Sequence, residues 1–182
     1  MEAKMAHVKL LGLSGALRKG STNTLLLQEA ARLMGDAELT LADLNLPLYD
    51  GDLEAAEGVP AAVQKLAAQI SEADAVVIST PEYNRGLSGV LKNALDWVSR
   101  VEGSAWAGKP VALMSSAAGR SGGDRGLVML HSCMTPFQPK IVAGPEVTVA
   151  ASYNEFDAEG RLQGELYVKN LTALMANLRA AI

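Results

Sequence analysis

The sequence predicts a three-layer α/β protein, in which a doubly wound, five-stranded parallel sheet of order 2-1-3-4-5 carries helices on both faces. Short apolar runs typical of buried strands alternate five times with longer amphipathic stretches typical of helices. Strands joined by helical crossovers run parallel. The 182 residues, 49% of them hydrophobic, suffice for a single domain over 1–182 with a full core.

Each strand is expected where a short apolar run is bounded by glycine, proline or polar residues. The clearest is Ala75–Thr80, which Pro81 closes. The other expected strands are His7–Leu13, Glu38–Ala42, Pro110–Met114 and a fifth made from Ile141–Val142 and Val147–Ala150, around Gly144–Pro145.

The helices are expected in the amphipathic stretches between these runs. They are Asn23–Met34, Val59–Ser71, Ser88–Arg100, Asp124–Met134 and Glu159–Ala181, the last beginning after Gly160 or Gly164. Asp43–Glu57 contains proline, glycine and several acidic residues, and is expected to be a solvated surface loop.

The composition excludes several classes of function. A net charge of −4, from 16 basic and 20 acidic residues, argues against binding nucleic acid or an anionic membrane. No run approaches the roughly 18 apolar residues of a membrane span. Cys133 is the single cysteine, which fits a reducing, cytoplasmic location, and with two histidines it leaves little material for a metal site.

The loop after the first strand has the features of a phosphate site. It opens a helix, where unpaired N–H groups and the helix dipole attract anions. Its side chains supply neutral donors and one guanidinium, from Ser14, Ser21, Thr22, Asn23 and Arg18. No acidic residue occurs from Ala3 through Gln28. An ordinary capped turn is the alternative, because serine, threonine and asparagine are common N-caps.

This loop is not a nucleotide P-loop. Gly15 and Gly20 have the required spacing, but Ser21 stands where the lysine belongs. The third strand also ends in Ser79-Thr80, without an aspartate to hold magnesium. An ATPase or GTPase is therefore disfavoured, and a G-x-G-x-x-G fingerprint is absent.

Two further loops are expected at the same edge of the sheet. Pro81–Gly89 offers backbone amides, a flat ring at Tyr83 and a donor and acceptor at Asn84. Ser115–Gly123 has three glycines and small side chains, which let a ligand approach the backbone. Phosphate donors at one end and an aromatic ring at the other suit a phosphorylated planar heterocycle.

These segments resemble the NADPH-dependent FMN reductase family, which includes quinone, azo-dye and chromate reductases. The resemblance covers about residues 7–150 and is most specific from Thr80 to Trp97. The matching blocks are Ser14–Asn23, Leu46–Asp50, Thr80–Asn84, Gly89–Trp97 and Gly119–Gly123.

The resemblance implies a flavodoxin-like fold, non-covalent FMN and a homodimer or homotetramer with FMN near the subunit interface. Arg18, Ser21 and Asn23 would hold the phosphate, and helix Ser88–Arg100 would be a packing surface. The implied cofactor-binding residues are Ser14, Arg18, Ser21, Thr22, Asn23, Pro81, Glu82, Tyr83, Asn84, Ser115, Ser116 and Gly119. Ala16 departs from the family, which commonly has a phosphate-binding serine there, and this loss would weaken FMN binding by about tenfold to a hundredfold.

The implied reaction passes hydride from NAD(P)H through flavin N5 to a small-molecule acceptor: a quinone, an azo compound, free flavin or an oxyanion such as chromate. The cofactor carries this chemistry, so no catalytic side chain is assigned. An FMN-binding electron carrier, or a scaffold that has lost FMN, are the alternatives. His131 and Cys133 face different directions on a helix and predict no catalytic pair, whereas Glu82 is expected to bind through its backbone, with its carboxylate at the surface.

Overall fold

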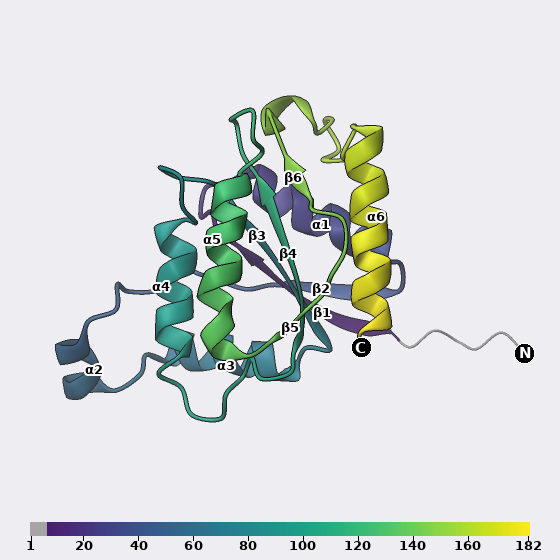
Figure 1. The fold of residues 1–182 in the computed structure, drawn as a ribbon. Coiled ribbons are helices and arrows are strands. Elements are labelled where there is room, and N and C mark those ends of the chain that lie inside the picture. The colour runs from purple at the N-terminus through teal and green to yellow at the C-terminus, as the bar shows by residue number, and fades with distance from the viewer. Residues whose placement is uncertain (1–6) are drawn as a thin grey trace, which may run out of the picture.

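The sheet has the predicted order. The computed structural model describes residues 7–182, so the first six residues of the expected domain lie outside it. The strands follow the path β2-β1-β3-β4-β5, all parallel, and a further strand, β6, also bonds to β4 (Figure 1). The strands are β1 Val8–Ser14, β2 Ala37–Leu41, β3 Ala75–Thr80, β4 Pro110–Ser116, β5 Lys140–Ile141 and β6 Thr148–Val149.

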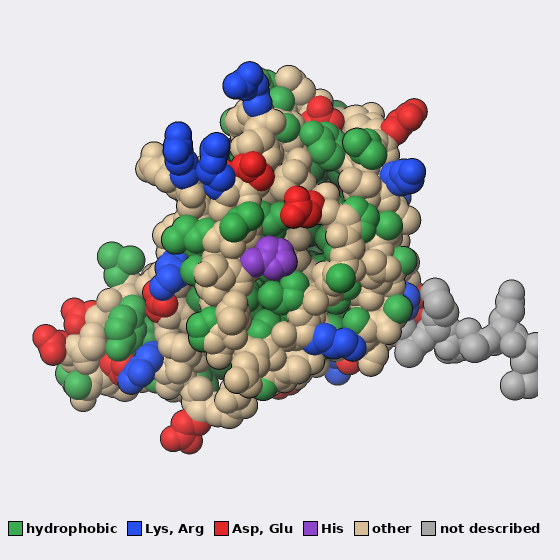
Figure 2. Space-filling view, in the orientation of Figure 1, with side chains coloured by type: hydrophobic (Ala, Val, Ile, Leu, Met, Phe, Trp, Pro, Cys, Tyr) green, Lys and Arg blue, Asp and Glu red, His purple; other side chains and the backbone are tan. Residues whose placement is uncertain are grey.

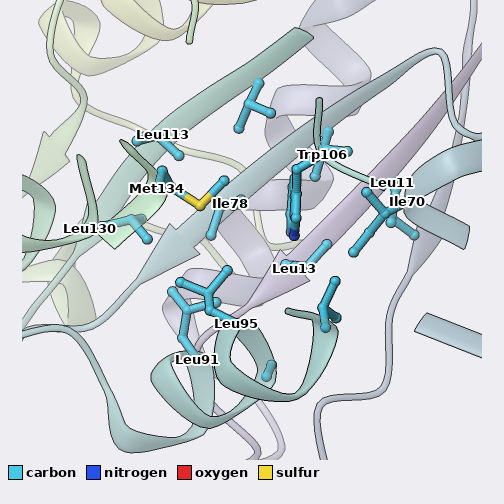
Figure 3. Close-up of a cluster of buried hydrophobic side chains, with 14 of the residues drawn as sticks. Leu11, Leu13, Ile70, Ile78, Leu91, Leu95, Trp106, Leu113, Leu130 and Met134 are labelled. Atoms are coloured by element: carbon cyan, nitrogen blue, oxygen red, sulfur yellow. The ribbon is translucent and has the colours of Figure 1, made fainter. Parts of the chain in front are cut away.

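Helices cover both faces of this sheet (Figure 1). Side chains alternate along each central strand, so that Val77 of β3 packs with α1 and α6 while Ile78 packs with α3, α4 and α5. Figure 3 shows the second group, in which Trp106 and Met134 lie beside leucines from the strands and helices. The helices are α1 Thr22–Met34, α2 Gly51–Glu57, α3 Ala61–Glu72, α4 Gly89–Val98, α5 Asp124–Met134 and α6 Glu165–Ala180, with 3-10 turns η1 Thr135–Phe137 and η2 Ser152–Asn154.

The segment Asp43–Glu57 corrects the expectation of a loop, because its second half is helix α2. Asp50 caps this helix by accepting a hydrogen bond from Asp52 N at 2.9 Å. Acidic residues in the first turn also stabilise the helix, because their negative charge is attracted by the positive end of the helix dipole. Glu54 is also less solvated than expected, since its side chain is 19% exposed and pairs with Arg100 at 3.0 Å.

Near the C-terminal end, the last strand differs from expectation, and the last helix has one of its two expected starts. The predicted fifth strand is divided into two short strands, and Pro145 between them has no N–H to give to a ladder. Helix α6 begins after Gly164, the second of its two expected starts, and the preceding residues form a small hairpin with a bridge between Phe156 and Leu162. In the described residues, no helix is long and apolar enough to cross a membrane.

Candidate functional site

A pocket of about 330 Å³ lies at the carboxyl ends of β1, β3 and β4, the upper edge of the sheet in Figure 1. Nine of the twelve predicted site residues line it. They are Arg18, Ser21, Thr22, Asn23, Pro81, Glu82, Tyr83, Ser116 and Gly119. The volume falls within the range of small-molecule sites.

The β1–α1 loop gives the pocket its phosphate-binding character. Ser21 is the N-cap of α1, and its Oγ accepts a hydrogen bond from Asn23 N at 3.2 Å. The hydroxyl hydrogen of Ser21 is therefore free to donate to a ligand. Arg18 is exposed at the pocket wall, and the first turn of α1 contains no acidic residue. Amides at the start of α1 also lack partners within the helix, so the loop is suited to an anion.

Asn23 is buried in this wall, and its side chain is hydrogen-bonded to protein groups. Its Oδ1 accepts from Ser79 Oγ at 2.7 Å and Ser116 N at 3.2 Å, and its Nδ2 donates to Ser116 O at 2.9 Å. The side chain is 3% exposed. It joins α1 to the ends of β3 and β4 and fixes the width of the pocket between them.

Three predicted residues lie outside the lining. Ser14 Oγ donates to Ala16 O at 3.4 Å and accepts from Thr24 Oγ1 at 2.9 Å. Ser115 is fully buried, and its Oγ donates to Thr80 O at 2.7 Å, across the ends of two strands. Asn84 projects to solvent at the tip of a turn. Ser14 and Ser115 therefore stabilise the loops behind the pocket.

The β3–α4 loop is a tight turn, closed by two hydrogen bonds of 3.0 Å between Tyr83 and Gly86. Asn84 and Arg85 at its tip have φ values of 50° and 67°, in the left-handed region. The turn presents the ring of Tyr83, 56% exposed, at the mouth of the pocket.

The carboxylate of Glu82 corrects the expectation of a surface group. Its side chain is 14% exposed, and Oε2 accepts from Arg125 N at 3.1 Å and Gly126 N at 3.3 Å. It thus satisfies amides in the first turn of α5. Glu82 therefore joins the β3–α4 loop to the first turn of α5.

The β4–α5 loop brings a buried, unpartnered hydroxyl to the pocket. Ser116 Oγ is buried without a hydrogen-bond partner, although Ser116 lines the cavity. Behind it, Gly123 has φ 93°, and a Cβ at this position would collide with Ser115 Oγ. A buried, unpaired hydroxyl at the wall of a pocket fits a hydrogen bond to a ligand.

The sequence did not predict the fourth wall of the pocket, which follows β6. Ser152 and Tyr153 of η2 line the cavity, and Ser152 Oγ lies 3.1 Å from Thr22 Oγ1. The signal was present, since these residues follow the last strand at the same edge of the sheet.

Neither His131 nor Cys133 lines this pocket; Cys133 borders a separate cavity of about 600 Å³ near Trp106.

The residues present fit FMN. Arg18 and the α1 amides suit a phosphate, the open ring of Tyr83 suits a flat heterocycle, and Ser116 Oγ supplies a polar contact between them. Lys and Arg side chains, with acidic ones among them, lie at this end of the molecule (Figure 2). Arg85 and Arg120, in the loops after β3 and β4, are exposed. Arg18 is the basic side chain that lines the pocket, and its charge favours an anionic ligand.

Fold and pocket define a flavodoxin-like protein with a candidate ligand pocket at the switch point of the sheet. The chain belongs to the NADPH-dependent FMN reductase family, whose model matches residues 8–154. The predicted family, its oxidoreductase class and FMN as its cofactor are thereby confirmed.

Individual relatives match nearly the whole chain. It is 41% identical over 178 residues to an NAD(P)H-dependent FMN reductase of Pseudomonas aeruginosa, covering 94% of this chain and 96% of the relative. It is 38% identical over 164 residues to a quinone reductase of Escherichia coli, covering 87% and 85%. Among solved structures, the NAD(P)H:acceptor oxidoreductase FerB of Paracoccus denitrificans superposes with a TM-score of 0.84 at 30% identity, covering 95% and 96%.

Proposed function

We propose that the chain is an FMN-dependent NAD(P)H oxidoreductase whose acceptor is a quinone. The observation that carries the proposal is the pocket itself, with anion-binding groups at the α1 end and an exposed aromatic ring at the β3–α4 end. The quinone reductase of Escherichia coli supports this choice of acceptor. Bound FMN supplies the two-electron exchange between NAD(P)H and the acceptor.

The residues of this chain bind and orient the cofactor. Arg18, Ser21 and the α1 amides would hold the phosphate, while Pro81, Glu82 and Tyr83 would lie beside the ring system, with Asn84 at the exposed tip of their turn. Ser116 Oγ, which has no partner in the protein, would donate a hydrogen bond to the cofactor, and Gly119 lines the same pocket. Ser14, Asn23 and Ser115 keep these loops in register through the hydrogen bonds described above. Thr22 Oγ1 is hydrogen-bonded to Ser152 Oγ, so that this pair joins the start of α1 to η2.

The decisive experiment follows the visible spectrum of the purified protein. The protein is loaded with FMN, mixed with NADPH or NADH without oxygen, and then given a quinone. We expect bound yellow flavin that bleaches on mixing and recovers with the quinone. Flavin that stays yellow with both nucleotides would favour an electron carrier, and failure to bind FMN at all would favour a scaffold.

Two variants of the same loop test the phosphate end. Arg18→Ala removes the guanidinium that lines the pocket, and Lys19→Ala removes a neighbouring exposed charge that does not line it. We expect Arg18→Ala to weaken FMN binding by about tenfold to a hundredfold, as for the loss of one charge-assisted hydrogen bond. Lys19→Ala should change affinity little. Equal losses would show that only overall charge matters.

A panel of acceptors tests the substrate class. Azo dyes, free flavin and chromate are the other candidates, and each is assayed beside a quinone with the same reduced enzyme. The highest kcat/KM is expected with a quinone. A dye or chromate preferred over every quinone would overturn this part of the proposal.

Assembly and location belong to the same proposal. The exposed apolar side chains of Val128 and Met129 on α5 support a homodimer or homotetramer. Light scattering coupled to size exclusion measures the mass, and a single monomeric peak at micromolar concentration would contradict this. The cytoplasm is the proposed compartment, supported by the single cysteine.

A further inference from the structure

Tyr153 combines an exposed side chain with a fixed backbone. Its side chain is 68% exposed and lines the pocket. Tyr153 is the middle residue of η2, which begins directly after Ala151. The φ of Ala151 is 44°, in the left-handed region. Such a conformation is unfavourable for a residue with a Cβ, and it persists where surrounding contacts enforce it.

Those contacts join η2 to the loop after β4. Ala151 N donates to Gly119 O at 3.3 Å, and Ser152 N donates to Ala117 O at 3.2 Å. Within the turn, Asn154 N donates to Ala151 O at 2.9 Å. A large aromatic side chain is thus left in solvent on a backbone that is held before it by the β4–α5 loop and closed after it by a hydrogen bond within the turn.

The anchor also reaches the phosphate end of the pocket. Ser152, directly before Tyr153, is 4% exposed, and its Oγ lies 3.1 Å from Thr22 Oγ1 at the first position of α1. Tyr153 therefore shares its end of the cavity with Arg18 and Ser21. Ala16, in the same wall, has no hydroxyl to offer a phosphate.

We propose that Tyr153 is a further cofactor-binding residue, whose hydroxyl donates a hydrogen bond to the phosphate of FMN. The inference rests on the proposed function, because it takes FMN as the ligand of this pocket. Tyr153 of η2 would thus supply, from the opposite wall, the hydroxyl that the β1–α1 loop lacks at Ala16. The rigid backbone of η2 places the phenol there at a small entropic cost, since only the side-chain torsions remain to be fixed.

The test compares two ligands that differ only in the phosphate. FMN and riboflavin are titrated separately into the wild type and Tyr153→Phe, with flavin fluorescence as the readout. We expect Tyr153→Phe to weaken FMN binding by about tenfold or more, as for a lost charge-assisted hydrogen bond. Riboflavin binding should be unchanged. Tyr49→Phe is the matched control. Tyr49 is also an exposed tyrosine, and its hydroxyl donates a hydrogen bond to Glu54, but it does not line the pocket.

Each other outcome contradicts the proposal in a distinct way. If Tyr153→Phe binds both flavins as tightly as the wild type, the hydroxyl makes no contact with the phosphate. If Tyr153→Leu weakens both flavins equally while Tyr153→Phe weakens neither, the ring stacks on the isoalloxazine instead. If the wild type itself binds no FMN, the proposed function fails as well. A circular dichroism spectrum of each variant confirms that the fold is retained.

Discussion

Glu29 is an almost fully buried carboxylate, with a side chain only 2% exposed, in the middle of α1. It accepts hydrogen bonds of 2.9 Å from Arg32 and Arg161, and one of 3.4 Å from Leu162 N. Burial raises the pKa of Glu29, but the hydrogen bonds from the two guanidinium groups outweigh it, so the pKa lies below its usual value. The ion pair fastens the hairpin before α6 onto α1.

We expect Glu29→Gln to lower the free energy of unfolding by about 1.5–3 kcal/mol at pH 7, the range for hydrogen bonds to a charged group. Because the folded pKa is depressed, the wild type's advantage is complete above the unfolded value of 4.5 and is lost as pH falls through the folded pKa. Urea denaturation at several pH values measures both effects.

The matched control is Glu57→Gln, since Glu57 is an exposed carboxylate at the end of α2. It should change stability by less than about 0.5 kcal/mol. A difference between wild type and Glu29→Gln that stays constant down to pH 3 would contradict the assigned titration.

Arg85 occupies a left-handed position that favours glycine. We expect Arg85→Gly to raise stability by about 0.5–1 kcal/mol, because relief of the side chain's strain exceeds the added entropy of the unfolded chain. Thermal unfolding should show a rise of roughly 1–4 °C. Asn84→Gly, at φ 50° in the same turn, should gain less, since asparagine tolerates this region. A larger gain from Asn84→Gly would contradict this account.

At the scale of elements, α2 is the least integrated helix among the described residues. None of its residues is buried, and Figure 1 shows it projecting from the body beyond α4. Its stability therefore depends on the Asp50 cap and on the Glu54 contacts with Tyr49 and Arg100.

We expect Asp50→Ala to destabilise α2 by about 1 kcal/mol through loss of the cap. Amide hydrogen exchange should then be faster over Gly51–Glu57 and unchanged in β3 and β4. FMN affinity should also be unchanged, because α2 does not line the pocket. Faster exchange throughout the sheet would show that α2 is coupled to the core.

The elements that sequence predicted well are those in which burial and pattern agree. Strand β3 is buried at every position, and α3 and α4 have continuous apolar faces. Helix α2 was missed because it buries nothing, so its sequence carries no apolar period and only its cap marks it. The divided last strand depends on Pro145 and on pairing with β4, which local pattern does not show.

At the scale of the whole molecule, FMN in the proposed pocket would contact the loops after β1, β3, β4 and β6, so its binding should stabilise the fold. At a free concentration of 100 times Kd, a ligand adds about 2.7 kcal/mol. For a chain of this size the expected rise in Tm is roughly 5–10 °C. Differential scanning fluorimetry measures it. Adenosine at the same concentration is the control, and an equal rise with it would indicate non-specific stabilisation.

Three walls of the pocket were predicted because loops after neighbouring parallel strands must meet at one edge. What sequence did not give was the direction of individual side chains. Asn23 and Glu82 turn toward protein amides and carbonyls, which depends on how α1 and α5 dock. The wall at Tyr153 was missed for a similar reason, since the contact between Ser152 and Thr22 spans 130 positions of the sequence.

That contact has a consequence for the order of events on the ribosome. The β1–α1 loop is synthesised before the other walls of the pocket, whereas Ser152 and Tyr153 emerge only after β1–β6 have been made. A nascent chain that ends before η2 would carry three walls of the pocket without the fourth. Capture of FMN should therefore be a late event in biosynthesis, following assembly of the sheet.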